Sequence, residues 1–224
     1  MEDNDLIKTG LNNVFSFIAD NGSKRLVTKS LVPSVKDEKT IKVWNEEYRL
    51  WDPYHSKLAA LILNGAKIPL KKDSSVLYLG AANGTTVSHV SDIVSDGVVF
   101  AVEFSPRAMK DLIRISTPRK NLIPILADAR HPATYRNMVT EVDLVYQDVA
   151  QREQAEIAIR NAELFLKKGG YIVLMIKSKS IDSVKNTDDV SRIEITKLGE
   201  LFKVAGSMNL EPFHLDHVAV IAQK

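Results

Sequence analysis

The sequence predicts an α/β fold in which a mostly parallel sheet, covered by helices on both faces, follows a small β-rich N-terminal module. From Ser56 onward, apolar strand-like runs alternate with helix-like segments, and this alternation is typical of a parallel sheet with helices on both faces. Before that point, short β-favouring runs are joined by turn signals such as Asn21-Gly22, which are typical of hairpins. We therefore expect two domains, a small β-rich one over residues 1–52 and a larger α/β one over residues 53–224.

The N-terminal module is predicted to contain two hairpins. The first joins Val14–Ile18 to Arg25–Thr28 through the Asn-Gly turn, and the second joins Thr40–Val43 to Tyr48–Trp51 with a turn at Asn45-Glu46. A module of about 50 residues buries little core of its own. We therefore expect it to pack against the rest of the chain.

The larger domain is predicted to contain alternating strands and helices. Strands are expected near residues 76–80, 98–103, 121–126, 142–147, 171–177 and 217–222, and helices near residues 57–63, 87–94, 106–115, 153–166 and 190–205. Ser56 is a suitable N-cap for the first helix, and Pro106 after Ser105 is a natural helix start. Gly169-Gly170 is predicted to end the helix that precedes it.

Composition excludes several classes of protein. The chain has 224 residues, 45% hydrophobic and 26% charged residues and a formal net charge of +2, which is ordinary for a globular protein and gives no strong overall signal for a polyanion. The absence of cysteine excludes disulfides, thiol catalysis and cysteine-based metal sites. No histidine pair has zinc-site spacing, so no metal is expected. No apolar run approaches the roughly 20 residues that cross a bilayer, and no signal peptide is evident, so a cytoplasmic location is expected.

The most informative segment is the strand-like run that ends in small residues and then opens a helix. Its turn and helix start consist of Gly80, Ala81, Ala82, Asn83, Gly84, Thr85 and Thr86. A turn with almost no side chains lets a ligand approach the backbone, and a helix start offers free N–H groups. The spacing matches neither the Walker loop nor the dinucleotide fingerprint G-x-G-x-x-G.

An acidic residue follows this turn at the end of the next predicted strand. Glu103 stands roughly 20 residues beyond the turn, where a carboxylate binds a ribose diol in nucleotide-binding folds. The combination indicates an adenosyl ligand without a pyrophosphate, such as S-adenosylmethionine. The alternative is an ordinary strand–helix turn with a surface glutamate.

Two more carboxylates end predicted strands at corresponding places. Asp128 and Asp148 are expected beside Glu103 at the carboxyl edge of the sheet, around one crevice. Asp128 with Ala129 is a candidate to read the adenine edge. The alternative for each acid is that it merely caps the segment that follows.

Two lysines and a histidine are candidates for chemistry at the same edge. Lys177 ends an apolar strand, Lys57 stands at the start of the first helix against its dipole, and His217 opens the last strand. Two lysines near Asp148 form a workable proton-abstraction site, because like charge and partial desolvation favour the neutral amine. The alternative for Lys57 is an ordinary surface lysine.

Taken together, these residues and their neighbours resemble the fibrillarin family in its short archaeal form. The matching segments extend over nearly the whole chain: Trp51–Ala60, Val76–Val90, Val102–Arg107, Asp148–Gln151, Lys177–Asp182, Leu210–Phe213 and Asp216-His217. The resemblance implies a Rossmann-like S-adenosylmethionine-dependent methyltransferase domain behind the small β domain. It also implies RNA ribose 2′-O-methylation directed by a box C/D guide RNA, on rRNA or tRNA, with a Nop-family scaffold and a kink-turn-binding protein of ribosomal type as partners.

The resemblance also implies roles for individual residues. It assigns S-adenosylmethionine binding to Gly80, Ala81, Ala82, Gly84, Thr85, Thr86, Glu103, Phe104, Asp128, Ala129, Asp148 and Gln151. It assigns the catalytic set to Lys57, Asp148, Lys177 and His217, with Lys177 the candidate base for the 2′-hydroxyl. The competing hypotheses are a guide-independent RNA methyltransferase of the heat-shock 23S rRNA type and a non-catalytic scaffold module.

Three residues depart from the usual pattern of the family. Asn83 stands where serine is usual, Asp52 where asparagine is usual and His55 where arginine is usual. The change at His55 is expected to affect RNA or scaffold contacts beside Lys57. None of the three removes a candidate catalytic group.

Overall fold

A computed structural model gives the fold, and it describes residues 6–33, 38–43, 45–182, 184 and 186–224. The N-terminal part of the chain forms a five-stranded antiparallel sheet in the order β1-β2-β3-β5-β4. Its strands are β1 (Ile7–Lys8), β2 (Val14–Ile18), β3 (Lys24–Lys29), β4 (Thr40–Val43) and β5 (Glu46–Trp51). Both predicted hairpins are confirmed, although Glu46 already belongs to β5 and the two-residue strand β1 was not predicted.

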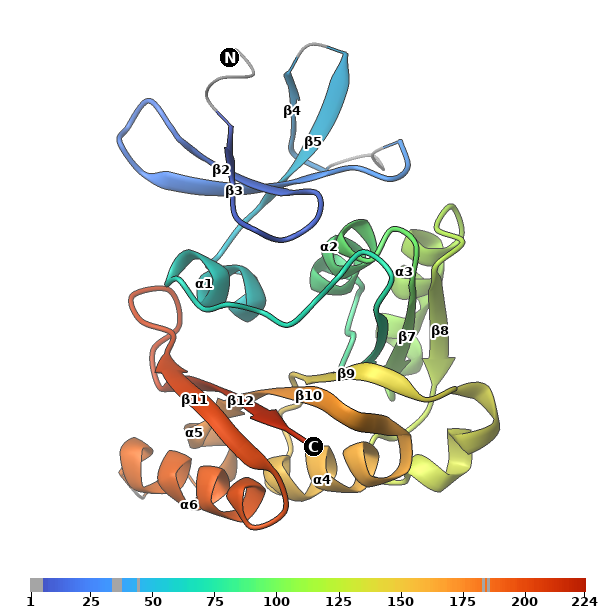
Figure 1. Cartoon of the computed structure of the whole chain (residues 1–224), viewed down its shortest axis with the longest axis vertical. Coiled ribbons are helices and arrows are strands. Elements are labelled where there is room, and N and C mark those ends of the chain that lie inside the picture. Colours follow the sequence, from blue (N-terminus) through green and yellow to red (C-terminus); the bar gives the residue numbers. More distant parts are fainter. Residues whose placement is uncertain (1–5, 34–37, 44, 183, 185) are drawn as a thin grey trace.

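The rest of the chain forms a seven-stranded sheet in the order β11-β12-β10-β9-β6-β7-β8 (Figure 1). Its strands are β6 (Ser75–Leu79), β7 (Val98–Glu103), β8 (Leu122–Leu126), β9 (Val142–Gln147), β10 (Leu166–Lys177), β11 (Lys203–Asn209) and β12 (His217–Gln223). Strands β8, β7, β6, β9 and β10 are parallel neighbours, whereas β12 pairs antiparallel with both β10 and β11. The predicted mostly parallel sheet is therefore confirmed.

Helices cover both faces of this sheet (Figure 1). The helices are α1 (Lys57–Leu63), α2 (Thr85–Ile93), α3 (Pro106–Ser116), α4 (Gln154–Phe165), α5 (Ser178–Ile181) and α6 (Thr187–Gly199), with a 3₁₀ segment at Pro132–Met138. Apolar residues of α1, α2 and α3 share one buried cluster, and those of α4 and α6 share another on the opposite face. Ser56 caps α1 by accepting from the N–H of Ala59, as predicted. The predicted helix start at Pro106 is confirmed, and Ser105 is the N-cap of α3.

Two predicted boundaries are wrong. Gly169-Gly170 does not end a helix, because α4 already ends at Phe165 and both glycines lie inside β10, at a shift in its register with β9. The predicted helix over residues 190–205 ends at Gly199, and its last residues belong to β11, a strand that was not predicted. Among the described residues, no helix is long and apolar enough to cross a membrane.

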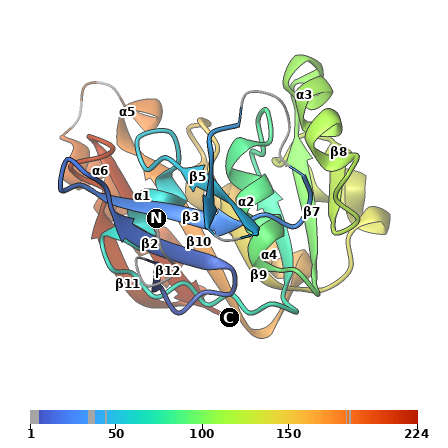
Figure 2. The ribbon, with the colours of Figure 1, turned by 90° about the horizontal axis from the view of Figure 1, so that it is seen from above.

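A buried polar network joins the N-terminal sheet to α2. Asp92 is fully buried and its carboxylate accepts from Arg49 and Arg119 at 2.6 Å each and from Thr28 Oγ1 at 2.9 Å. His89 is also buried, bonds Thr28 Oγ1 at 2.8 Å and stacks on Trp51 with ring centroids 4.7 Å apart. Since buried charges persist only when they are paired, this network fixes the sheet over α1 and α2, where Figures 1 and 2 show it.

Candidate active site

The carboxyl ends of the parallel strands meet at one edge of the large sheet, and the first candidate catalytic pair lies there. Lys57 opens α1, and Asp148 directly follows β9. The Lys57 Nζ donates to both carboxylate oxygens of Asp148 at 2.8 Å, with the two side chains 19% and 25% exposed. The lysine at the helix start therefore faces a carboxylate rather than solvent, as predicted from its unfavourable position against the helix dipole.

Lys177 and His217 lie beside this pair. The two residues are cross-strand partners in the antiparallel pairing of β10 with β12. Burial lowers the pKa of His217, and the positive charge of Lys57 lowers it further while the carboxylate of Asp148 opposes the change. The ring Nδ1 of His217 donates to the carbonyl of Leu215 at 2.6 Å, because a carbonyl only accepts. The structure thus places His217 near the Lys57–Asp148 pair, and Lys177 opposite His217 on the neighbouring strand.

Ser56 links three elements next to Lys57. Its Oγ accepts from Trp51 Nε1 at 2.9 Å, from Thr86 Oγ1 at 3.1 Å and from the N–H of Ala59 at 3.3 Å. These donors belong to the end of β5, the first turn of α2 and α1. One buried hydroxyl therefore connects the helix that carries Lys57 to residues 80–86, called the glycine turn below, and to the N-terminal sheet.

His214 is a site residue that sequence reasoning missed. Its ring lies 5.6 Å from that of His217, centroid to centroid, and its Nε2 donates to the carbonyl of Pro53 at 2.7 Å. Burial lowers the pKa of His214, and the positive charge of Lys57 acts in the same direction. No sequence signal marked it, because it stands in an irregular segment and its partner is a backbone carbonyl far along the chain.

The glycine turn is built for close backbone approach. Gly80 has φ +82°, and a Cβ there would lie 2.3 Å from the carbonyl oxygen of Asp148. Ala82 also has a positive φ, of 49°, and its N–H donates to Glu103 Oε2 at 2.8 Å. Gly84, with φ +95°, is the N-cap of α2 and supplies no side-chain hydrogen bond to the helix. The turn therefore lies directly against the segment that carries Asp148. The N-cap glycine offers no side chain to α2, and Asn83 Oδ1 accepts from the N–H of Thr85 at 3.4 Å.

The predicted ribose acid is already engaged by backbone. Glu103 is 6% exposed, and its Oε1 accepts from the N–H of Ser105 at 2.8 Å while Oε2 accepts from Ala82. Each carboxylate oxygen has a second lone pair that can accept from a ribose hydroxyl. Phe104 follows directly and is 64% exposed.

Asp128 binds the segment that follows it, which was the alternative to a role in binding adenine. Its carboxylate pairs with Arg130 at 2.6–3.1 Å and accepts from the N–H of the same residue at 2.9 Å. The Arg130 guanidinium holds the pKa of Asp128 below its usual value. Ala129 lies beside it and its carbonyl accepts from Asn161 at 2.9 Å. The Ala129 N–H and the spare lone pairs of Asp128 are the groups that suit an adenine edge.

The three residues that depart from the family pattern interact locally. His55 Nδ1 and Asp52 Oδ2 lie 2.9 Å apart on the surface beside Lys57. Burial acts to raise the pKa of Asp52, but the N–H of Tyr54 and the His55 ring outweigh it and the pKa is lowered. Asn83 Oδ1 accepts from Thr85 Oγ1 at 3.1 Å. Asp52 and His55 therefore form a hydrogen bond with each other, and Asn83 binds the Thr85 hydroxyl within the glycine turn.

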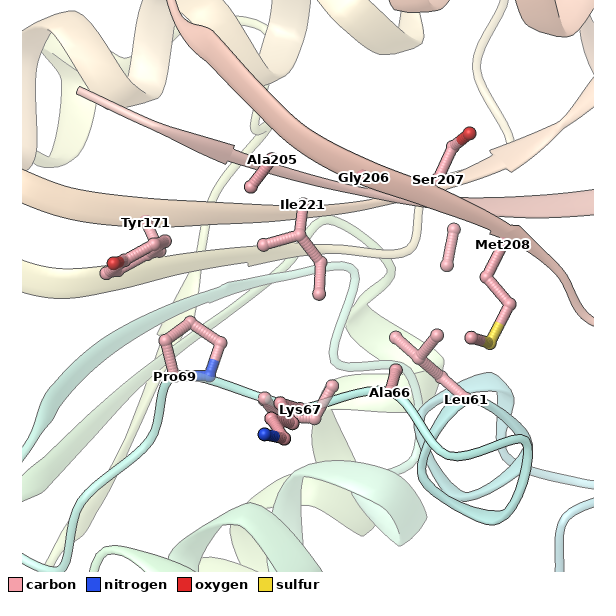
Figure 3. A pocket seen from close by; sticks show the side chains of 12 residues that line it. Leu61, Ala66, Lys67, Pro69, Tyr171, Ala205, Gly206, Ser207, Met208 and Ile221 are labelled. Carbon is pink, nitrogen blue, oxygen red and sulfur yellow. The ribbon is translucent and has the colours of Figure 1, made fainter.

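A separate hollow of 430 Å³ lies between the segment after α1 and the strands β11 and β12. Figure 3 shows Pro69, Lys67 and Leu61 on one side of it and Tyr171 and Ile221 on the other. Its lining is mostly apolar and includes none of the four candidate catalytic residues. The chemistry therefore belongs to the strand edge and not to this hollow.

The residues at the strand edge fit an adenosyl cofactor. The turn at Gly80 presents backbone, the N-cap residue of α2 is a glycine, and Glu103 supplies acceptors beside an exposed aromatic ring. Among the described residues, no group of three histidine, aspartate or glutamate side chains is arranged to hold a metal ion.

A family model named Fibrillarin matches residues 7–224. The chain belongs to the fibrillarin family. A relative named fibrillarin-like rRNA/tRNA 2′-O-methyltransferase, from Methanosarcina barkeri, is 51% identical over 223 residues and covers 97% of this chain and 98% of its own length. The predicted membership of the family is thereby confirmed.

Solved structures of fibrillarins have the same fold. Aeropyrum pernix fibrillarin, in complex with natively bound S-adenosyl-L-methionine, has a TM-score of 0.86 at 44% identity and covers 94% of both chains. A fibrillarin in complex with Nop5p has a TM-score of 0.85 at 43% identity and covers 94% of this chain and 97% of its own. The predicted Rossmann-like methyltransferase fold is therefore confirmed.

Proposed function

We propose that this fibrillarin-family protein transfers a methyl group from S-adenosylmethionine to the 2′-hydroxyl of ribose in rRNA, and in tRNA, at positions selected by a box C/D guide RNA. The observation that carries the proposal is the bidentate contact of Lys57 with Asp148, made beside Lys177 and His217. This group lies at the strand edge next to the glycine turn, as a transfer between cofactor and RNA requires.

The turn and the following strand ends would hold the cofactor. The residues that would offer backbone and hydroxyl groups are Gly80, Ala81, Ala82, Gly84, Thr85 and Thr86. Glu103 would accept from a ribose hydroxyl, and the other residues that would border the cofactor are Phe104, Asp128, Ala129, Asp148 and Gln151. When bound, S-adenosylmethionine supplies a methyl group activated by its sulfonium, so positioning of the acceptor oxygen supplies most of the catalysis.

The lysines prepare the acceptor oxygen. Lys177 takes the proton of the ribose 2′-hydroxyl on its Nζ, because Lys57 is already bound to the carboxylate of Asp148. Among the described residues, no carboxylate lies within ion-pair distance of Lys177. The charge of Lys57 stabilises the developing oxyanion. His217, whose Nδ1 is committed to Leu215, presents its other nitrogen to the site as an acceptor.

The assembly supplies RNA affinity that the chain alone lacks. A formal net charge of +2 gives a weak electrostatic attraction to a polyanion. The solved fibrillarin complex with Nop5p supports a Nop-family scaffold as partner, and we extend the proposal to a guide RNA and a kink-turn-binding protein. The proposed location of this assembly is the cytoplasm of an archaeal-type cell.

The test replaces one catalytic residue at a time. Asp148→Ala and Lys177→Ala should each abolish methylation in the reconstituted assembly while circular dichroism and melting temperature show an intact fold. Lys168→Ala, at the opposite end of β10 from Lys177, is the matched control and should retain activity. Full activity of either active-site variant would refute the assignment of that residue.

A further inference from the structure

The end of β10 lacks a strand partner on one side. The parallel pairing of β10 with β9 ends at Leu174 and Gln147, before β10 reaches Lys177. The antiparallel pairing with β12 continues to Lys177 and His217. The backbone that carries the proposed base is therefore held by a strand on the β12 side only.

The side chain of Gln154 takes the place of the missing strand. Its Oε1 accepts from the N–H of Lys177 at 2.9 Å, and its Nε2 lies 3.4 Å from the carbonyl oxygen of the same residue. The Nε2 also donates to the carbonyl of Gln151 at 3.0 Å. One amide thus binds the strand end that carries Lys177 and the loop that follows Asp148.

A second buried glutamine completes the connection. Gln147, the last residue of β9, donates from Nε2 to the carbonyl of Gln154 at 2.7 Å. Gln147 and Gln154 are both 0% exposed, so neither amide has solvent as an alternative partner. Because Asp148 directly follows Gln147, the carboxylate and the lysine of the site are fixed by the same pair of side chains.

We infer that Gln154 is a positioning residue for the methyl-transfer reaction, which sets the place of Lys177 relative to Asp148 and to the Gln151 loop. The inference rests on the proposed function, in which Lys177 is the base. Loss of the amide releases the last residues of β10 on the β9 side, and a misplacement of about 1 Å costs on the order of 100-fold in rate. Gln154 itself touches backbone, so its removal acts through the placement of Lys177.

The experiment combines kinetics with amide hydrogen exchange on the full chain. Gln154→Met keeps the length of the side chain and removes all three contacts. Gln154→Glu keeps the acceptor for the Lys177 N–H and removes both contacts of Nε2, to the carbonyls of Gln151 and Lys177. The matched control is Asn121→Leu: the side-chain amide of Asn121 also binds backbone, donating to the carbonyls of Ser91 and Val94 at 2.9 Å each, at the end of α2 opposite to its turn.

In the assembly with a guide RNA and target, Gln154→Met should lower kcat roughly 10- to 100-fold with the KM for RNA unchanged. The peptide that contains Lys177 should exchange its amides faster. Gln154→Glu should recover part of the kcat and the slow exchange, which also covers the case that the methionine variant fails to fold. Asn121→Leu should change neither kcat nor exchange at Lys177.

Two results would overturn the inference. One is a kcat of Gln154→Met within twofold of wild type, and the other is a lower kcat with unchanged exchange at Lys177. Lys177→Ala, assayed in parallel, separates this inference from the proposed function. Full activity of Lys177→Ala refutes the assignment of the base, whereas inactive Lys177→Ala with fully active Gln154→Met refutes only the positioning role.

Discussion

Replacing Asp92 by asparagine should destabilise the protein severely. Asp92 is fully buried, and its carboxylate is the shared partner of Arg49 and Arg119, each at 2.6 Å. It also accepts from Thr28 Oγ1 at 2.9 Å and from the N–H of Leu31 at 3.2 Å. Asparagine removes the negative charge and turns an NH₂ group toward donors. The buried guanidinium of Arg119 then loses its carboxylate partner, and that of Arg49 keeps the carboxylate of Glu38, at 2.6 Å.

The expected magnitude follows from the burial of this network. Removing one partner of a buried ion pair costs about 3–5 kcal/mol, because the remaining charge stays desolvated and unpaired. For a chain of this size, 1 kcal/mol corresponds to roughly 2–4 °C of melting temperature. We therefore expect Asp92→Asn to lower the melting temperature by about 10 °C.

Thermal and urea unfolding of Asp92→Asn and of a matched control measure this effect. The control is Asp96→Asn, since Asp96 pairs with Lys72 at 2.9 Å between side chains that are more than half exposed. Exposed ion pairs contribute little to stability, so this variant should melt close to wild type. Equal melting temperatures for the two variants would refute the argument that the buried network holds the N-terminal sheet on α2.

Three further predictions concern the turn, the buried histidine and the cap of α1. Gly80→Ala should destabilise the fold and abolish methylation, because its Cβ would lie 2.3 Å from the carbonyl oxygen of Asp148; Gly206→Ala, where a Cβ meets nothing within 4 Å, should be tolerated in both assays. Burial holds the pKa of His89 well below its usual value, so the unfolded chain takes up a proton near pH 6.5 that the folded chain excludes. The contribution of His89 to the free energy of unfolding is therefore fully present above pH 6.5 and is lost below it by up to about 1.4 kcal/mol per pH unit. Urea titrations of His89→Phe at several pH values should show a shallower decrease of the free energy of unfolding with falling pH. The same decrease as in wild type would contradict this. Ser56→Ala should cost about 1–2 kcal/mol in urea unfolding, as expected for a lost N-cap, and should also lower methylation; wild-type kinetics would show that its link to the turn is dispensable.

Local patterns in the sequence identified the strands whose side chains are buried along most of the strand. The strands β6, β7 and β9 are buried along most of their length, and their sequences are mostly apolar, as is typical of strands covered on both faces. The edge strand β11 is mostly exposed, with small and polar residues and a register shift between Val204 and Gly206. Neither alternation nor an apolar run marks such a strand, so its first residues were assigned to the preceding helix.

The candidate site was predictable where strand ends converge. Asp148 and Lys177 end neighbouring parallel strands, so their proximity follows from the order of the sheet. Gln154 and His214 were not predictable, because their partners are backbone atoms far along the chain and no local pattern marks such contacts. The ion pair of Asp128 with Arg130 was also missed, although the two residues are separated by a single position.

The most direct test of the proposed function is one methylation assay with labelled S-adenosylmethionine. The chain is incubated with a complementary target RNA, with and without a box C/D guide RNA, a Nop-family scaffold and a kink-turn-binding protein. We predict label on the guide-specified ribose 2′-oxygen only in the full assembly. Label on RNA without partners would instead indicate a guide-independent methyltransferase, and cofactor binding without any transfer in the full assembly would contradict the catalytic role of Lys57, Asp148 and Lys177.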